Sequence, residues 1–348
     1  MRLIFSFIWQ LLVIGLVLAA LACAFGALAG LLGFVWPVLD IFNHGQLVYL
    51  PVIVAGLVLA LLALRKQPVR GLFVASLATG LLASVTIATP EFIDTWAKRP
   101  EALPDRPVIR LMTYNIYANN RALTRVSEPI DAVDPDILVL QEFWPEFRSD
   151  LDPILDARFP YRVRCQGGQR AYIALYSKYP FEAAPGQDCI DSPSRTERTA
   201  HIAVRFTEPG PRPFTVMTTH LDWPLPAERK RLQFAALSQD IATIPGPLVI
   251  AGDFNSTPFS QFLRNFARDN GLTRETHVLP TYPASDFPRF LSSEIPLWRN
   301  LPIELRVPLF LPLDQVMQRQ GIRVLKVELA PSSGGSDHFP VVVDFQVE

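Results

Sequence analysis

Three long runs of apolar residues occupy most of the first ninety positions of the chain. No Asp, Glu, Lys or Arg stands between Arg2 and Asp40, between Asp40 and Arg65, or between Arg70 and Glu91. Each run can hold the roughly 20 apolar residues that a helix needs to cross a bilayer. The pattern therefore predicts a membrane anchor in residues 1–89. Its three transmembrane helices are expected at about 11–35, 47–64 and 71–89.

The first run is longer than one straight span requires, so we expect its N-terminal part to tilt or to lie in the membrane interface. A signal peptide is the competing interpretation of this run, and it would be followed by soluble sequence. Two further apolar runs follow instead, which favours helices that stay in the membrane.

Basic residues predict the orientation of the anchor. Arg2 precedes the first run, and Arg65, Lys66 and Arg70 lie between the second and the third, whereas positions 36–46 contain no Lys or Arg. Because cytoplasmic loops are enriched in Lys and Arg, the N-terminus and the second loop are placed in the cytoplasm. The sequence thus predicts a multi-pass protein of the inner (plasma) membrane whose remaining domain is periplasmic or otherwise extracytoplasmic.

After a proline-containing linker at 90–107, short strand-like runs alternate with helical stretches through residues 108–348. Because strands often follow one another directly, this order predicts an α/β fold of two mixed sheets, a four-layer α/β/β/α sandwich, rather than one doubly wound sheet. The expected strands are Val108–Ile116, Asp136–Gln141, Ala171–Ser177, Ala200–Phe206, Phe214–Thr219, Leu248–Ala251, Gln315–Met317, Arg323–Glu328 and Val341–Val347. The expected helices are 121–133, 146–157, 226–243 and 258–269.

Composition and charge exclude several classes of protein. The chain is 49% hydrophobic and 19% charged, with 3 Cys and a net charge of −1, which does not fit a disordered chain or a disulfide-rich miniprotein. Positions 1–99 hold 6 basic and 3 acidic residues, so 26 basic and 30 acidic residues remain beyond them, a net charge of −4. This balance argues against a protein that coats nucleic acid, although a local basic patch stays compatible with it. Cys165 and Cys189 flank a predicted hairpin, and both a disulfide and two unpaired thiols are left open.

Acidic, amide and imidazole side chains end several of the expected strands. These endings are Thr113-Tyr114-Asn115, Leu140-Gln141-Glu142, Thr219-His220-Leu221, Gly252-Asp253-Phe254-Asn255 and Ser336-Asp337-His338-Phe339-Pro340. Each one alone fits an ordinary turn. Together they predict a common cleft at the ends of the strands.

Such a set suits phosphoester chemistry with a hard cation. Carboxylate and amide oxygens bind Mg²⁺ through one or two carboxylates and leave room for water and a phosphate. A His held by an acid can take a proton from water near neutral pH, and amides with a further His can hold phosphate oxygens as charge shifts. Neither His-x-x-x-His nor paired Cys spacing is present, which argues against zinc.

The ordered motifs Tyr-Asn, Gln-Glu, Thr-His-Leu, Gly-Asp-Phe-Asn, Leu-Asp-Gln-Val and Ser-Asp-His-Phe-Pro-Val resemble those of the endonuclease/exonuclease/phosphatase superfamily, from about Val108 onward. That superfamily includes deoxyribonuclease I-like nucleases, apurinic endonucleases, neutral sphingomyelinases and inositol polyphosphate 5-phosphatases. The resemblance implies a Mg²⁺-dependent hydrolase, with Mn²⁺ as the alternative ion. Such an enzyme cleaves a phosphodiester or a phosphomonoester by in-line attack of an activated water.

The resemblance also implies roles for single residues. Glu142 resembles the principal Mg²⁺ ligand, with Asn115 beside the metal and Asp337 as a second carboxylate on the metal side. Asp253 resembles the residue that orients or activates the attacking water, and Asn255 resembles a donor to a phosphate oxygen.

The two histidines of the motifs take separate roles in this resemblance. His220 resembles the residue that stabilises the pentacoordinate phosphorus. His338 resembles the general base, oriented by Asp314 as an acid fixes an imidazole tautomer. The sequence leaves open whether Asp253 or His338 takes the proton.

One position departs from the family pattern. Gln315 follows Asp314 where the family usually has an aromatic residue or His, which affects expected substrate contacts more than the mechanism. Thr281-Tyr282-Pro283 resembles a family segment before this acid. The Pro-rich apolar insertion at 284–312 is expected to be a loop packed on the domain, with a membrane-facing rim as the alternative.

The sequence names no single substrate: nucleic acid and a lipid or small-molecule phosphoester are weighted equally, and no protein partner is inferred. The alternative outside the enzymes is a non-catalytic membrane protein whose folded domain binds a phosphate-bearing partner. That alternative predicts the loss of at least one of the central residues. None of Glu142, Asp253, Asn255, Asp314 and His338 is lost.

Overall fold

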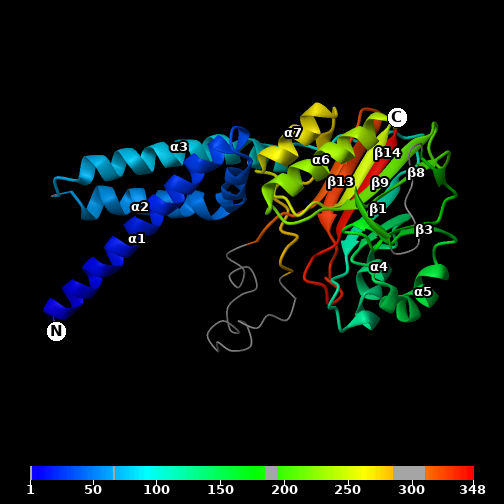
Figure 1. Cartoon of the computed structure of the whole chain (residues 1–348), viewed down its shortest axis with the longest axis horizontal. Coiled ribbons are helices and arrows are strands. Elements are labelled where there is room, and N and C mark those ends of the chain that lie inside the picture. The colour runs from blue at the N-terminus through cyan, green and yellow to red at the C-terminus, as the bar shows by residue number, and fades with distance from the viewer. Residues whose placement is uncertain (1, 66, 185–193, 285–309) are drawn as a thin grey trace.

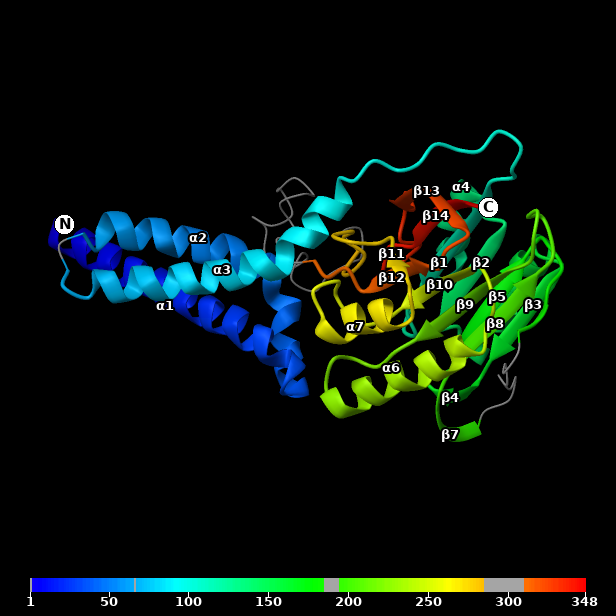
Figure 2. The same cartoon turned by 90° about the horizontal axis from the view of Figure 1, so that it is seen from above.

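The computed structural model describes residues 2–65, 67–184, 194–284 and 310–348. A bundle of three long helices projects from a sandwich of two sheets that carries helices on both outer faces (Figures 1 and 2). The predicted α/β/β/α sandwich, preceded by three long apolar helices, is confirmed.

The helical elements follow the chain in this order. The bundle contains α1 (Arg2–Leu31), α2 (Gln46–Ala63) and α3 (Arg70–Thr95), with the 3-10 helices η1 (Leu32–Phe34) and η2 (Pro37–Gly45) between the first two. The sandwich contains η3 (Leu123–Arg125), α4 (Ser127–Val133), η4 (Pro145–Phe147), α5 (Arg148–Asp156), α6 (Ala227–Ala242) and α7 (Gln261–Asp269).

Each main sheet mixes parallel and antiparallel neighbours. The first sheet has the order β13 (Ile322–Leu329), β14 (Val341–Val347), β1 (Ile109–Asn115), β2 (Ile137–Gln141), β5 (Ile173–Ser177), β3 (Tyr161–Cys165). The second has the order β11 (Thr273–Arg274), β12 (Asp314–Gln318), β10 (Leu248–Asp253), β9 (Phe214–His220), β8 (His201–Phe206), β6 (Glu182–Ala183). The strands β4 (Gly167–Gln169) and β7 (Ser194–Thr199) pair with each other.

Side chains that alternate along the strands build three apolar layers. On β1, Ile109 and Leu111 join the core between the two sheets, whereas Met112 and Tyr114 face α4 and α5. The other outer layer joins α6 and α7 to the second sheet through residues such as Leu237. Burying a large apolar side chain contributes about 1.5–3 kcal/mol. Because successive side chains of a strand point to opposite faces of the sheet, alternate residues of each strand belong to different layers.

Small residues let the three bundle helices approach closely. A Cβ on Gly56 of α2 would lie 2.1 Å from the Cβ of Ala20, and a Cβ on Gly80 of α3 would lie 2.3 Å from that of Ala24. Helices in membranes use such small residues to pack. Among the residues that the structure describes, three helical segments are long and apolar enough to cross a membrane, namely Phe7–Phe34, Pro37–Ala63 and Arg70–Thr95.

The structure differs from the expected element bounds in a few places. The helix α3 continues through Pro90 to Thr95, into the predicted linker at 90–107, because Glu91 on this extension is buried against the sandwich. The strands β4, β6 and β11 are two or three residues long, too short to show an alternating pattern. Of the insertion at 284–312, only Ala284 and positions 310–312 are among the described residues, so its expected packing stays a prediction. Cys165 is disulfide-bonded, whereas Cys189 lies outside the described residues.

Candidate active site

The register of the strands brings the predicted site residues to one edge of the sandwich. In the first sheet, β1 and β2 are parallel and pair Asn115 with Gln141, so Asn115 and Glu142 end neighbouring strands. In the second sheet, Asp253 pairs with His220 on one side and with Asp314 on the other. Carboxyl ends of parallel strands meet at the same edge. Five of the eight predicted residues are thus placed by strand pairing.

Asp253 stands at the centre of the cluster and joins the two sheets. Its side chain is 1% exposed, and its Oδ2 accepts a hydrogen bond from Asn115 Nδ2 at 3.0 Å. The same amide nitrogen lies 3.4 Å from Glu142 Oε1. Burial raises the pKa of Asp253. The arrangement holds two carboxylates around one amide.

His220 approaches the same carboxylates from the second sheet. Its Nε2 lies 3.5 Å from Asp253 Oδ2 and 3.9 Å from Glu142 Oε1. Burial lowers the pKa of His220 to about 4, because a charged ring is costly away from water. The ring is therefore neutral at neutral pH.

His338 forms a pair with Asp314. Its Nδ1 lies 2.8 Å from Asp314 Oδ2, and its Nε2 lies 3.9 Å from Asp253 Oδ2. Burial alone would lower the pKa of His338, but the carboxylates of Asp314 and Asp253 outweigh burial and raise it to about 10. His338 thus carries positive charge beside Asp253.

Asn255 turns its amide into the site. Its Nδ2 donates to the carbonyl oxygen of Leu221 at 2.9 Å, which fixes the orientation of the amide. Within the described part of the chain, its buried Oδ1 has no hydrogen-bond partner. Because an unsatisfied buried oxygen is costly, this atom is suited to a cation or to the O–H of a bound water.

Asp337 is the remaining carboxylate of the predicted residue set. Burial raises its pKa to about 6, and the negative charges of Glu142 and Asp253 act in the same direction. The negative charges of Glu142 and Asp253 thus disfavour the ionised form of Asp337. Oxygen ligands that repel one another without a cation fit a hard divalent ion.

Two groups of side chains can be compared as possible metal ligands. Asp253, Asp314 and His338 offer ligand atoms within 4.8 Å of one another, but Asp314 and His338 already satisfy each other. Glu142 and Asp337 are only partly buried, so their carboxylate oxygens stay accessible to a cation. This set fits the cation that the sequence predicts.

The replacement Asp337→Asn tests this electrostatic picture. The unfolded carboxyl titrates near pH 3.8 and the folded one near pH 6, so its charge destabilises the metal-free fold above about pH 6 and has no effect below about pH 4. With EDTA at pH 7.5, we expect the variant to be more stable than the wild type, with a free energy of unfolding higher by about 2 kcal/mol. With saturating Mg²⁺ the order should reverse, because the wild type alone keeps the full ligand set.

Urea denaturation at pH 4 and pH 7.5 measures both differences, and Asp105→Asn, an exposed acid in the linker, serves as the control. Equal stabilities of wild type and Asp337→Asn in all conditions would remove Asp337 from the site.

Unusual backbone conformations also occur at the site. Glu142 and Asn255 are non-glycine residues in the left-handed region, with φ of 57° and 44°, and such conformations cluster at functional sites. Gly252 precedes Asp253 where a Cβ would lie 2.1 Å from the carbonyl oxygen of Thr219. Only glycine therefore fits at the second sheet's active edge.

Several functional neighbours were not predicted from the sequence. Lys230 of α6 is 1% exposed, and its Nζ donates to the carbonyl oxygens of Phe254 and Asn255. Burial lowers the pKa of Lys230 to about 7. Its position between Arg229 and Arg231 suggests a solvated helix face, and only the packing of α6 reveals its burial.

Other neighbours hold His338 and Asp314 in place. The ring of Tyr282 lies 4.9 Å from that of His338. Thr281 Oγ1 accepts from the backbone N–H groups of Leu313 and Asp314 at 3.1 and 3.3 Å. The predicted Thr281-Tyr282-Pro283 segment is thus adjacent to the cluster.

Gln315, the departure from the family pattern, is a buried structural residue. Its Nε2 donates to the carbonyl oxygens of Ser256 and Pro312 at 3.1 and 2.9 Å, and Thr276 Oγ1 donates to its Oε1 at 3.1 Å. These contacts tie the loop after Asp253 to the strand that begins with Asp314.

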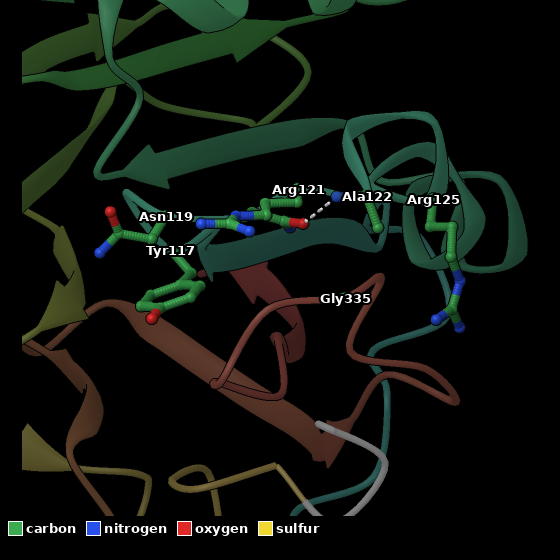
Figure 3. Close-up of a pocket in the computed structure, with 7 residues that line it drawn as sticks. Tyr117, Asn119, Arg121, Ala122, Arg125 and Gly335 are labelled. Atoms are coloured by element: carbon green, nitrogen blue, oxygen red, sulfur yellow. Dashed lines mark hydrogen bonds between the residues drawn. The ribbon is translucent and has the colours of Figure 1, made fainter. Parts of the chain in front are cut away.

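A hollow of about 550 Å³ lies along the segment that follows β1, with Gly335 on its wall (Figure 3). Tyr117, Asn119 and Arg121 line one part of it, and Arg125 lies on the side away from Tyr117. The backbone N–H of Ala118, between the lining residues Tyr117 and Asn119, donates to Glu142 Oε2 at 2.6 Å, so this segment also contacts a predicted site residue. Arg125 is paired with Glu128, so it is the guanidinium group of Arg121 that suits the hollow to an anionic ligand.

Comparison with known proteins identifies a family. A family model described as "Endonuclease/Exonuclease/phosphatase family" matches residues 112–338, a range that contains all eight predicted site residues. The UPF0294 protein VP2298 of Vibrio parahaemolyticus is 26% identical over 253 residues, which cover 70% of this chain and 80% of that protein.

Solved structures are similar as well. The endonuclease/exonuclease/phosphatase from Bacteroides vulgatus matches with a TM-score of 0.50 at 19% identity, over 70% of this chain and 100% of that chain. A family protein from Bacteroides thetaiotaomicron matches with a TM-score of 0.49 at 14% identity, over 70% and 99% of the two chains. At the identity of the Bacteroides vulgatus protein the likeness bears on the fold alone.

Proposed function

Because the chain belongs to the endonuclease/exonuclease/phosphatase family, we propose that it is a membrane-anchored, Mg²⁺-dependent hydrolase of phosphoric ester bonds. The observation that carries this proposal is the convergence of the predicted residues around the buried carboxylate of Asp253. Asn115, His220 and His338 all reach this carboxylate from different elements. Members of the family are phosphoesterases and nucleases, and the complete residue set argues against a purely binding domain.

Asp253 is the proposed proton acceptor for the attacking water. Its burial raises its pKa, which moves a carboxylate toward the range of an effective general base. His338 is already charged, so it stabilises the negative charge beside it rather than taking the proton. Asp314 holds the ring of His338 in place.

Asn255 orients that water in this proposal. Its Nδ2 donates to the carbonyl oxygen of Leu221 and lies near His220 and Asp253, whereas its Oδ1 has no hydrogen-bond partner within the described residues and is the atom left to accept from a water. We propose that this oxygen accepts a hydrogen bond from the O–H of the attacking water that Asp253 does not deprotonate. This role replaces the phosphate contact that the family resemblance implies. The neutral ring of His220 then hydrogen-bonds a phosphate oxygen as charge shifts in the in-line displacement.

Glu142 and Asp337 are the proposed Mg²⁺ ligands, with Asn115 beside them. When bound, the ion supplies positive charge that neutralises phosphate oxygens. Mn²⁺ is the alternative ion for the same oxygen ligands.

The hollow along the segment that follows β1 receives the remainder of the substrate. Arg121 lines it, and a guanidinium group suits a phosphodiester or a phosphomonoester with further anionic groups. Nucleic acid and a lipid or small-molecule phosphoester both meet this description.

The proposed location is the inner (plasma) membrane, with residues 1–89 as a multi-pass anchor, 90–107 as the linker and 108–348 as a periplasmic or otherwise extracytoplasmic catalytic domain. In support, the N-terminus and the turn between α2 and α3, which holds Arg65 and Arg70, lie at the end of the bundle away from the sandwich (Figure 1). Basic residues favour the cytoplasmic side.

Turnover by the full-length protein in nanodiscs tests the proposed function. With Mg²⁺ we expect hydrolysis of bis-p-nitrophenyl phosphate or p-nitrophenyl phosphate, its loss in EDTA and its return with added Mg²⁺. Plasmid DNA, RNA, sphingomyelin and phosphoinositides, assayed in parallel, then identify the substrate class. The proposal would be refuted if none of these phosphoesters were hydrolysed in a chelator-sensitive reaction.

A further inference from the structure

The membrane anchor contacts the catalytic domain through buried charged groups. Asp40 in η2 is 2% exposed, and Glu91 near the end of α3 is 0% exposed. Both face the side of the sandwich that carries α6 and α7 (Figure 2). Buried carboxylates are stable only when they are paired, so their partners define the contact.

Asp40 binds the first turn of α7. Its Oδ2 accepts from Ser260 Oγ at 2.7 Å, and its Oδ1 accepts from the backbone N–H of Gln261 at 2.6 Å. Ser260 is the N-cap of α7 and accepts from the N–H of Leu263. A carboxylate at a helix N-terminus also complements the helix dipole. The anchor thus completes the cap of a helix in the catalytic domain.

His44 binds the segment before α7. Its Nδ1 accepts from the backbone N–H of Thr257 at 3.2 Å. Thr257 is two residues from Asn255 and four from Asp253. Lys230 of the catalytic domain holds the carbonyl oxygens of Phe254 and Asn255. The segment from Asp253 to Gln261 is therefore held by the domain and by the anchor together.

Glu91 and an apolar cluster extend the same contact. Arg274 Nη1 lies 3.0 Å from Glu91 Oε2, and His277 Nδ1 lies 3.1 Å from the same oxygen. Phe259, 1% exposed, packs with Ile87 and Ala88 of α3. Removing the anchor would expose this ring and leave Thr257, Ser260 and Gln261 without their acceptors.

On this basis we propose that Asp40 and His44, in the loop between the first two membrane helices, are positioning residues of the hydrolytic site, because they fix the segment that carries Asp253 and Asn255. The proposal rests on the proposed function for its kinetic consequence. The anchor is then part of the catalytic scaffold rather than a tether, and its seating controls the rate of the reaction.

The test uses the full-length protein in nanodiscs and bis-p-nitrophenyl phosphate, a soluble substrate. Small displacements of catalytic groups cost up to about 10²-fold in rate, so we expect His44→Ala to lower kcat by about 10-fold with KM within about 2-fold. In His44→Asn the amide oxygen replaces Nδ1 as acceptor, and kcat should return to within about 3-fold of the wild type. Gln67→Ala, at an exposed position in the turn between α2 and α3, is the control.

Amide hydrogen exchange of segment 253–261 gives a second measurement that needs no activity. We expect exchange to rise at least about 10-fold in His44→Ala and to stay near wild type in His44→Asn and Gln67→Ala. Unchanged exchange in His44→Ala, or a kcat as low in His44→Asn as in His44→Ala, would overturn the proposal. A wild type without turnover would refute the proposed function instead, and exchange would still decide whether the anchor holds the segment.

Discussion

Glu142→Ala lowers the Mg²⁺-dependent turnover of bis-p-nitrophenyl phosphate by about 10³-fold, equivalent to about 4 kcal/mol of transition-state stabilisation. The reason is that Glu142 directly follows β2 and is the proposed principal Mg²⁺ ligand, and the Asn115 amide links its carboxylate to that of Asp253. Loss of its carboxylate lowers the affinity of the site for Mg²⁺, because a negatively charged ligand is removed. Initial rates across a Mg²⁺ titration measure the effect.

The matched control is Glu146→Ala, an exposed acid four residues along the chain, which should stay within about 2-fold of the wild type. The Mg²⁺ concentration for half-maximal rate should rise in Glu142→Ala alone. If Glu142→Ala kept the wild-type response to Mg²⁺, the metal would have to bind elsewhere.

His338→Ala lowers kcat by about 10²- to 10⁴-fold, the range for a lost group that takes part in proton transfer or stabilises charge in the transition state. Without the imidazolium, the buried carboxylates of Asp314 and Asp253 face each other across strands β12 and β10 with no cation between them. Single-turnover rates with Mg²⁺ present measure the chemical step.

His201→Asn is the matched control for His338→Ala, because His201 is also buried but lies on β8. It is expected to change stability without a comparable loss of kcat. A His338→Ala variant with wild-type kcat would show that the ring does not serve the reaction.

The position of the site could be predicted because strand ends carry it. The polar endings after β1, β2, β9 and β10 belong to parallel neighbours, whose carboxyl ends meet at one edge. Alternation of apolar residues marked those strands, and the motif order joined the endings that lie far apart in the chain. Fold and residue set therefore followed from local pattern and resemblance.

Long-range contacts could not be predicted in the same way. Lys230 has charged neighbours on α6, and its burial follows only from how that helix packs. Asp40 and Gln261 are 221 positions apart, and no local pattern links a loop between membrane helices to a helix cap in another domain. The proton assignment also depends on tertiary structure, since the charge of His338 is set by carboxylates from two other strand ends.

A double-variant cycle of Glu142→Ala and His338→Ala, read as kcat/KM for bis-p-nitrophenyl phosphate, tests most directly whether these residues form one hydrolytic centre. Residues that act as a unit are strongly non-additive. We predict that the double variant loses no more than about 10-fold beyond the worse single variant. Losses that multiply to the full product of the two single effects would contradict a shared centre.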